Sequence, residues 1–403
     1  MNLSIHRDDA AELLDDLLAE PVERALAREG AFATSASATS AAPVILYGAG
    51  ALGRRLGAAM EAAGLPVAAF GDRAARPDGS TINGLKVLSL QEVARVQGAR
   101  VVVAIYNPDH SFEVTAGELR ALGCRHVESW LPVAWSLGDA VLPHYAACRP
   151  SQVLAARAAV VAQASAWADQ ASVDEYVRQV RWRLTGDFSV LQPPLSDHYF
   201  AADVFRPLAH ETLVDCGAYD GDTLLDFIDR VPGFGVVYSY EPDPDNLNAL
   251  RRVVAALDPD VARRVHISAA AVGAYSGTSG FSAGAGTSAA LVARGSLGGN
   301  AGETVQVECI ALDEVLSDAT VTLLKMDIEG GEADALRGAA GILQRCRPVL
   351  AISAYHRPSD IWELPSLVNA LTDDYQLHLR SHGPDGFECV LYGVPTERAV
   401  RAV

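Results

Sequence analysis

The stretch VDCGAYDGDT, residues 214–223, joins a predicted strand (ETLVDCG) to a predicted helix (DTLLDFIDR) through Gly217, Ala218 and Gly221. Glycine at such a turn lets the backbone bend tightly and approach a ligand. In an open α/β sheet, ligands bind beyond the carboxyl ends of the central strands. The stretch therefore predicts an α/β fold with a ligand at the end of this strand.

The segments that follow alternate in the same way. Predicted strands are VVYSYEP, RVHISAAAV, VTLLKMD and PVLAISAY, with helical patterns between them, and the chain closes with YQLHLRS and FECVLYGV around the turn HGPDG. Alternating strands and helices are typical of a parallel sheet. The final hairpin predicts a doubly wound sheet of seven strands whose last strand is antiparallel. Residues 276–302, rich in Gly, Ser and Ala, interrupt the pattern and are expected to form a lid, a binding loop or a disordered segment.

The second predicted strand ends at Glu241 and Pro242, and Glu241 lies 24 residues after Gly217. An acidic residue at this place can accept hydrogen bonds from both hydroxyls of a ribose. The turn lacks a complete G-x-G-x-x-G pattern, which favours a nucleoside over a pyrophosphate. The alternative is that Asp215 and Glu241 only cap the helices that follow them.

Residues 323–339 read LLKMDIEGGEADALRGA and bring three charged residues, Lys325, Asp327 and Glu329, to the end of another strand. Lys325 and Asp327 share one face of that strand, because side chains alternate with a period of two. Buried charge is costly unless it is paired or functional. The alternatives are therefore a functional site and an internal Lys–Asp ion pair that shapes the loop.

The segment AISAYHRPSDIWELP, residues 351–365, places His356 just after the next strand. Beside a carboxylate, a histidine can act as a general base near neutral pH. The alternative is a loop histidine that caps the preceding strand.

With these motifs in order, residues 198–395 resemble the FkbM family of S-adenosylmethionine-dependent methyltransferases. The resemblance implies the class I methyltransferase fold, with S-adenosylmethionine as cofactor. It implies that Asp215, Gly217 and Gly221 border the methionine part of the cofactor and that Glu241 holds the ribose. The full cofactor-binding set that we expect is Asp215, Gly217, Ala218, Tyr219, Gly221, Glu241, Pro242, Ala271, Val272 and Asp327, in which Ala271 and Val272 line the adenine.

Members of this family methylate hydroxyl groups of sugars and of natural products, so the resemblance implies an O-methyltransferase with a small-molecule or glycan acceptor. Methyl transfer from a sulfonium is an in-line displacement that depends on positioning. We expect His356 or Asp327 to be the base and Glu329 to orient the acceptor, with Lys325 in the same catalytic group. A divalent metal at Asp327 and Glu329 is the less favoured alternative, so no metal is expected.

Nearer the N-terminus, YGAGALG places Gly48, Gly50 and Gly53 between a predicted strand and a predicted helix, and Asp72 follows 24 residues after Gly48. This is the context of a dinucleotide fingerprint. Together with the later N-G-x-x-V pattern at 83–87, the segment also resembles the nucleotide-sugar-binding domains of some bacterial sugar acetyltransferases. Three interpretations stay open: nucleotide-sugar docking, a Rossmann-like domain without a ligand, and NAD binding.

The chain has 403 residues, of which 32 are basic and 50 acidic, and its formal charge is −18. That balance argues against nucleic acid as a partner. No apolar run is long enough for a membrane span, the first residues lack a signal-peptide pattern, and the six cysteines are scattered, so a cytoplasmic protein is expected. Only two lysines occur, Lys86 and Lys325.

Four segments are predicted. They are an N-terminal helix and linker (1–42, with the linker at 31–42), a Rossmann-like domain (43–135), a helical connector (136–197) and the methyltransferase domain (198–403). The sequence leaves the oligomeric state open, a homo-oligomer included. Two rival functions are an NAD(P)-dependent oxidoreductase that uses the N-terminal fingerprint and a non-catalytic nucleotide-sugar-binding protein.

Overall fold

A computed structural model describes residues 9–37, 42–75, 79, 81–283 and 303–400. The chain forms two compact units. The first holds the described residues up to Ser165, together with Val173–Leu195 and Ser381–Glu388, and the second holds Ala166–Ser172, Ser196–Arg380 and the described residues from Cys389 onward. The unit with the predicted methyltransferase motifs is therefore the second.

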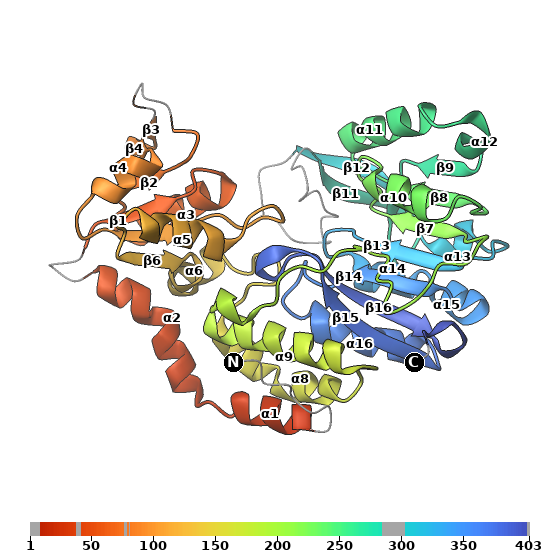
Figure 1. Cartoon of the computed structure of the whole chain (residues 1–403), viewed down its shortest axis with the longest axis horizontal. Coiled ribbons are helices and arrows are strands. Elements are labelled where there is room, and N and C mark those ends of the chain that lie inside the picture. The colour runs from red at the N-terminus through yellow and green to blue at the C-terminus, as the bar shows by residue number, and fades with distance from the viewer. Residues whose placement is uncertain (1–8, 38–41, 76–78, 80, 284–302, 401–403) are drawn as a thin grey trace. The chain divides into compact units, whose positions relative to one another are not determined.

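The second unit contains a seven-stranded sheet in the order β15-β16-β14-β13-β7-β8-β9 (Figure 1). Its strands are β7 (Leu213–Cys216), β8 (Val237–Tyr240), β9 (Val265–Ser268), β13 (Leu323–Met326), β14 (Val349–Ser353), β15 (Tyr375–Ser381) and β16 (Cys389–Pro395). The five strands from β9 to β14 are parallel, and β16 is antiparallel to β14. The predicted seven-stranded sheet with an antiparallel last strand is confirmed.

Helices connect these strands, with α10 and α11 near one end of the sheet and α16 near the other (Figure 1). They are α10 (Asp222–Arg230), α11 (Pro244–Ala255), α12 (Pro259–Ala262), α13 (Leu312–Val315), α14 (Glu332–Arg337), α15 (Ala340–Cys346) and α16 (Asp360–Leu371). Leu224 and Phe227, three residues apart on α10, are fully buried in a core shared with Leu213 and Val237. Burying a side chain of this kind contributes about 1.5–3 kcal/mol, so this face fixes α10 on the sheet.

Strand register brings the predicted motifs to one edge of the sheet. Lys325 on β13 lies opposite Asp215 on β7, and Cys216 lies opposite Tyr240 on β8. Because these strands are parallel, the residues that follow them emerge side by side. The turn after Cys216, Glu241 after β8 and Asp327 after β13 therefore meet at the carboxyl edge.

A smaller sheet corrects two predictions. The predicted strand 264–272 is divided between β9 and β10 (Ala271–Val272), which belong to different sheets. In the small sheet, β12 (Glu303–Ile310) pairs with β10 in parallel and with β11 (Gly277–Ala283) antiparallel. Residues 277–283 are thus a strand and not part of a loop, because they pair with β12. The rest of the predicted loop, 284–302, lies outside the described residues.

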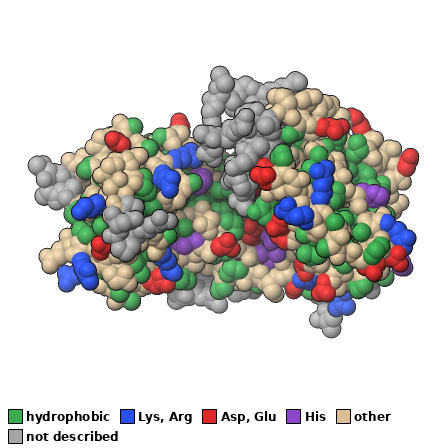
Figure 2. All heavy atoms as spheres, turned by 90° about the horizontal axis from the view of Figure 1, so that it is seen from above, with side chains coloured by type: hydrophobic (Ala, Val, Ile, Leu, Met, Phe, Trp, Pro, Cys, Tyr) green, Lys and Arg blue, Asp and Glu red, His purple; other side chains and the backbone are tan. Residues whose placement is uncertain are grey.

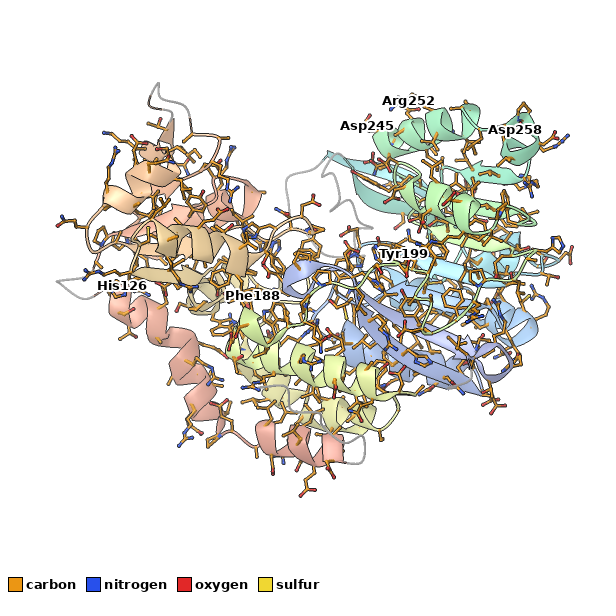
Figure 3. All side chains as sticks on the ribbon, in the orientation of Figure 1. His126, Phe188, Tyr199, Asp245, Arg252 and Asp258 are labelled. Atoms are coloured by element: carbon orange, nitrogen blue, oxygen red, sulfur yellow. The ribbon has the colours of Figure 1, made fainter. Side chains whose placement is uncertain are left out.

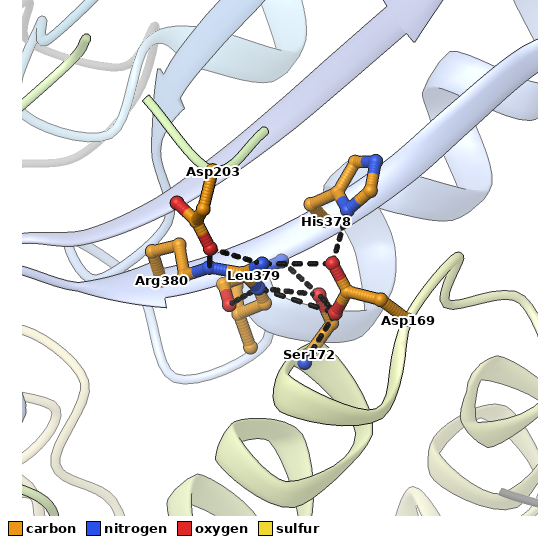
Figure 4. Close-up of polar contacts among 6 residues, drawn as sticks. All are labelled: Asp169, Ser172, Asp203, His378, Leu379 and Arg380. Carbon is orange, nitrogen blue, oxygen red and sulfur yellow. Dashed lines mark hydrogen bonds and ion pairs between the residues drawn. The ribbon is translucent and has the colours of Figure 1, made fainter. Parts of the chain in front are cut away.

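A buried arginine ties the chain around Asp169 to β15 (Figure 4). Arg380 Nη2 lies 2.7 Å from Asp169 Oδ2 and 2.8 Å from Asp203 Oδ2, and His378 Nδ1 lies 2.6 Å from Asp169 Oδ2. A buried guanidinium needs partners for its N–H groups. This network therefore holds two distant segments, around Asp169 and around Asp203, on the edge strand.

The first unit contains a six-stranded sheet in the order β3-β4-β2-β1-β5-β6. Its strands are β1 (Val44–Tyr47), β2 (Ala69–Gly71), β3 (Thr81–Ile82), β4 (Leu85–Leu88), β5 (Arg100–Val103) and β6 (His126–Ser129), with helices α3 (Ala51–Ala62), α4 (Leu90–Arg95), α5 (Phe112–Ala121) and α6 (Leu131–Leu137). The predicted parallel α/β domain is confirmed. The β3–β4 hairpin was not predicted, and α4 begins after it at Leu90.

Five more helices belong to the N-terminal and connecting segments. They are α1 (Ala10–Leu17), α2 (Val22–Ala36), α7 (Pro150–Ala155), α8 (Arg157–Ala164) and α9 (Gln170–Thr185). Helices α7, α8 and α9 lie in the segment 136–197 that was predicted as a helical connector. The predicted linker at 31–42 is wrong over its first half, because α2 continues to Ala36 with Phe32 buried. Among the described residues, every helix is too short or too polar to cross a membrane.

On the face seen in Figure 2, acidic and basic side chains are interspersed. Several of the arginines make local ion pairs, such as Arg230 with Asp226 at 2.8 Å and Arg337 with Asp334 at 2.8 Å. Exposed pairs of this kind contribute about 0–1 kcal/mol each. They moderate the excess of negative charge locally rather than stabilising the fold.

Candidate active site

The turn after β7 is built around Gly217. Its φ of +80° lies in the left-handed region, and a Cβ there would collide with the carbonyl oxygen of Asp327. The N–H groups of Gly217 and Ala218 both donate to Tyr240 O, at 2.9 and 3.1 Å. The turn therefore fits tightly between the ends of β8 and β13, which only glycine allows. Gly221, with φ of +98°, ends the turn at the start of α10, and Tyr219 is partly exposed.

Glu241, the first residue after β8, is buried and faces this turn. Its Oε2 accepts from the N–H of Tyr219 at 2.9 Å, and its Oε1 accepts from the N–H of Asp243 at 2.9 Å. Burial raises the pKa of Glu241, and these two N–H groups partly offset that rise. Each carboxylate oxygen keeps further capacity to accept a hydrogen bond. Glu241 thus holds the turn and still has the lone pairs that a ribose would need.

Lys325 and Asp215 form a buried ion pair beneath the turn. Lys325 Nζ lies 3.0 Å from Asp215 Oδ1 and donates to the Gly217 carbonyl oxygen at 2.6 Å. Burial opposes the charge of Lys325, but Asp215 and Asp327 outweigh it and raise the pKa of this lysine. Burial raises the pKa of Asp215, and Lys325 counteracts that rise. The ammonium contacts the backbone of the turn, so it is placed to shape the cofactor side of the site.

His356, Asp327 and Glu329, which were predicted as catalytic, lie together with a fourth residue, Glu332. His356 Nε2 is 3.2 Å from Asp327 Oδ1 and 3.8 Å from Glu329 Oε1, and Nδ1 is 2.8 Å from Glu332 Oε1. Glu332 is buried at the start of α14 and also accepts from the N–H of Ile328 at 2.9 Å. Glu332 is the last residue of the charged motif that begins at Lys325. Its place in that motif could have marked it as a candidate site residue.

The charges in this cluster fix its protonation. Burial lowers the pKa of His356, but Glu332, Glu329 and Asp327 together raise it well above 6.5. Burial would raise the pKa of Asp327, but His356 and Lys325 hold it well below its usual range. At neutral pH the imidazole is therefore a cation with a proton on both nitrogens. Of the two predicted bases, Asp327 and His356, this geometry favours Asp327, because an imidazolium has no lone pair to offer.

Tyr199 is part of the site and was missed by sequence reasoning. Its hydroxyl donates to Asp327 Oδ2 at 2.7 Å and lies 3.2 Å from Ser353 Oγ, at the ends of β13 and β14 (Figure 3). The two partners in the first bond are 128 residues apart, and Tyr199 stands in a segment without regular structure. No local pattern in the sequence marks such a residue.

Three of the clustered residues, Asp327, Glu332 and His356, each offer one atom within 4.8 Å of the others, as metal ligands would. A metal bound there would have to break the hydrogen bond between His356 and Glu332 or share an oxygen that already accepts a backbone N–H. The arrangement seen is that of a hydrogen-bonded cluster.

In the first unit, the predicted nucleotide residues also come together. Gly50 precedes α3, and a Cβ at Gly53 would collide with the carbonyl oxygen of Gly48. Asp72 accepts from the N–H groups of Ala49 and Ala74, both at 2.8 Å. This repeats the two hydrogen bonds that Glu241 accepts in the second unit. Whether a nucleotide binds here stays a prediction, as does the role of Ala271 and Val272, which are buried in β10.

The sheet has the strand order of class I methyltransferases. The glycine turn after β7 and the buried acid after β8 fit a site for S-adenosylmethionine. Residues 215–383 match the family model described as the methyltransferase FkbM domain. This part of the second unit is therefore similar to FkbM methyltransferase domains, and the protein is a methyltransferase that uses S-adenosylmethionine.

A solved structure shares the fold. The methyltransferase FkbM from Methylobacillus flagellatus KT aligns with a TM-score of 0.74 and 24% identity, over 97% of this chain and 100% of that one. Fibrillarin from Aeropyrum pernix, solved with S-adenosyl-L-methionine, aligns with a TM-score of 0.30 and 14% identity, over 47% of this chain and 67% of that one. No curated protein matches the chain. The first match shows that the folds of both units occur together in another protein.

Proposed function

We propose that this methyltransferase transfers the methyl group of S-adenosylmethionine to a hydroxyl group of a sugar, a glycoconjugate or another natural product. The observation that carries the proposal is the position of the Asp327 carboxylate beside the cofactor turn, between a histidine and a tyrosine hydroxyl. Asp327 forms an ion pair with His356 and accepts a hydrogen bond from Tyr199, and its backbone oxygen lies close to Gly217. A carboxylate in this place suits an acceptor that must lose a proton, as a hydroxyl does.

On the cofactor side, Glu241 would accept hydrogen bonds from the ribose hydroxyls, and the turn from Gly217 to Gly221 would border the methionine part. Lys325 supports this turn from below through the Gly217 carbonyl oxygen. The sulfonium carries a positive charge, and the carboxylates of Asp327 and Glu329 favour a cation next to them.

On the acceptor side, the hydroxyl oxygen attacks the methyl carbon in line with the sulfur. With S-adenosylmethionine bound, Asp327 would take the hydroxyl proton while the C–O bond forms and the C–S bond breaks, and the electrons of the C–S bond would stay on sulfur. The proton becomes more acidic as the C–O bond forms, so a carboxylate of low pKa can accept it. Glu329 orients the acceptor. General-base assistance of this kind contributes about 10²- to 10⁴-fold.

Titration calorimetry with S-adenosylmethionine tests the cofactor side. We expect Glu241→Ala to weaken binding by at least about 10- to 100-fold, because the loss of even one hydrogen bond between a ribose hydroxyl and a charged group costs about 1.5–3 kcal/mol. Asp72→Ala is the matched control, since Asp72 makes the same two backbone contacts in the first unit, and it should leave the affinity unchanged. Equal losses in both variants, with unchanged melting curves, would contradict the assignment of the cofactor to the second unit.

Release of S-adenosylhomocysteine tests the acceptor side. A crude polysaccharide extract and a panel of sugars should stimulate release above the rate in buffer, and the stimulation should vanish when hydroxyls of the added acceptor are blocked by prior methylation. The rival NAD(P) and scaffold functions predict no stimulation. The oxidoreductase hypothesis predicts instead a thermal shift with NAD that Asp72→Ala abolishes.

A further inference from the structure

The segment 196–206 precedes the matched domain and is held in place by two arginines. Arg230 Nη2 lies 3.0 Å from Asp197 Oδ1, and its guanidinium stands 5.2 Å from the centre of the Phe200 ring. Arg380 binds Asp203 at 2.8 Å (Figure 4). The part of this segment between Asp197 and Asp203 is therefore fixed at both ends relative to β15 and α10.

Tyr199 lies between these anchors, and its ring has little freedom. It stacks on the His198 ring with 3.8 Å between centres, and the Lys325 ammonium lies 5.0 Å from the centre of the Tyr199 ring. The side chain is only 5% exposed. The φ of Tyr199 is +62°, a conformation that costs about 1–3 kcal/mol for a residue other than glycine. Such strain persists only where the surroundings enforce it, as the two anchors do here.

The direction of the hydrogen bonds at the Tyr199 hydroxyl follows from its single proton. An ionised Asp327 only accepts, so Tyr199 must donate to it over the 2.7 Å distance. The oxygen of Tyr199 is then free to accept from Ser353 Oγ, 3.2 Å away and fully buried. A chain of donors therefore runs from Ser353 through Tyr199 to Asp327, and each bond in it strengthens the next.

We propose that Tyr199 is a positioning residue for methyl transfer: it holds Oδ2 of Asp327 so that the carboxylate stays ionised and in one orientation beside the cofactor turn. This inference rests on the proposed role of Asp327. The charged or titratable groups that face Asp327 are His356 after β14, Lys325 on β13 and Tyr199 itself. Glu329 lies near the same Nε2 of His356, and Glu332 is on the far side of the ring at Nδ1. Tyr199 is the group among them that comes from outside the matched domain.

Tyr199→Phe tests the proposal, because it removes the hydroxyl and keeps the stacked ring. Loss of a hydrogen bond to the charged form raises the pKa of a carboxyl group. We therefore expect the acidic limb of the pH profile of kcat/KM to move to higher pH by about one unit. Because the carboxylate also loses the contact that fixes its orientation, we expect kcat to fall about tenfold at neutral pH and the affinity for S-adenosylmethionine to change less than threefold.

Tyr392→Phe is the matched control. The Tyr392 hydroxyl is also buried and bonds to the backbone of Tyr199 and Ala201, so its loss loosens the same segment without touching Asp327. We expect this variant to melt at a lower temperature and to keep the pH profile of the natural protein. If both variants change kcat alike and neither moves the profile, Tyr199 is merely structural and the proposal is wrong.

A second measurement keeps the test independent of the acceptor. In protein labelled with ¹³C at aspartate side chains and saturated with S-adenosylhomocysteine, the Asp327 carboxyl signal, assigned with Asp327→Asn, should titrate at higher pH in Tyr199→Phe than in the natural protein. An unchanged titration overturns the positioning role even if methyl transfer to hydroxyls is confirmed. A shifted titration with no hydroxyl acceptor found would overturn the proposed function alone.

Discussion

Asp327→Asn should lower kcat for methyl transfer by about 10²- to 10⁴-fold while binding of S-adenosylmethionine changes by less than tenfold. The substitution keeps the size of the side chain and removes the charge that accepts the acceptor's proton. The amide oxygen can still accept from Tyr199, but the amide N–H₂ cannot accept from the His356 imidazolium. The variant thus loses both the group that accepts the acceptor's proton and the negative charge that pairs with the His356 imidazolium.

Rates of S-adenosylhomocysteine release, measured with saturating cofactor, separate this effect from weaker binding. Asp334→Asn is the matched control, because Asp334 stands on α14 close by in sequence and its carboxylate is exposed beside Arg337. We expect the control to act at the natural rate. If Asp327→Asn retains more than a tenth of the natural kcat, Asp327 is not the proton acceptor, and Glu329 would be the next group to test.

The sheet and the cofactor side of the site follow from local patterns. A strand, a glycine turn and an acid after the next strand recur in both units, and parallel pairing then brings Gly217 and Glu241 together without further information. The same logic places Asp327 beside Gly217. The sequence also carried an Asn83-Gly84 turn, the usual signal of a tight hairpin, and the two residues have φ of +51° and +78° between β3 and β4.

What the sequence could not show depends on distant contacts. Phe32 is buried under the Arg100 guanidinium, which lies 4.3 Å from the centre of its ring, and this contact supports α2 as far as Ala36. The sequence around Phe32 does not indicate that Arg100 will be its partner. Tyr199 belongs to the site for a similar reason. The protonation state of His356 could not be predicted either, because it depends on three carboxylates from another segment of the chain.

The ion pair beneath the turn leads to the second large effect, on stability. Lys325→Met should lower the free energy of unfolding by about 3–5 kcal/mol, because it leaves the Asp215 carboxylate buried without its counter-ion. It also removes the donor to the Gly217 carbonyl oxygen, so S-adenosylmethionine should bind more weakly. Lys325→Arg should be nearly as harmful, since a planar guanidinium does not fit the place of a compact ammonium.

A double variant separates the charge from the packing. In Lys325→Met/Asp215→Asn the buried charge is gone, and we expect urea denaturation to show recovery of at least half of the lost stability, while the affinity for S-adenosylmethionine stays low because the Gly217 carbonyl oxygen still lacks its donor. Lys86→Met, at the exposed position of the one other lysine, should change stability by less than about 0.5 kcal/mol. If the double variant is no more stable than Lys325→Met, the aliphatic packing of Lys325, and not its charge, is what stabilises the turn.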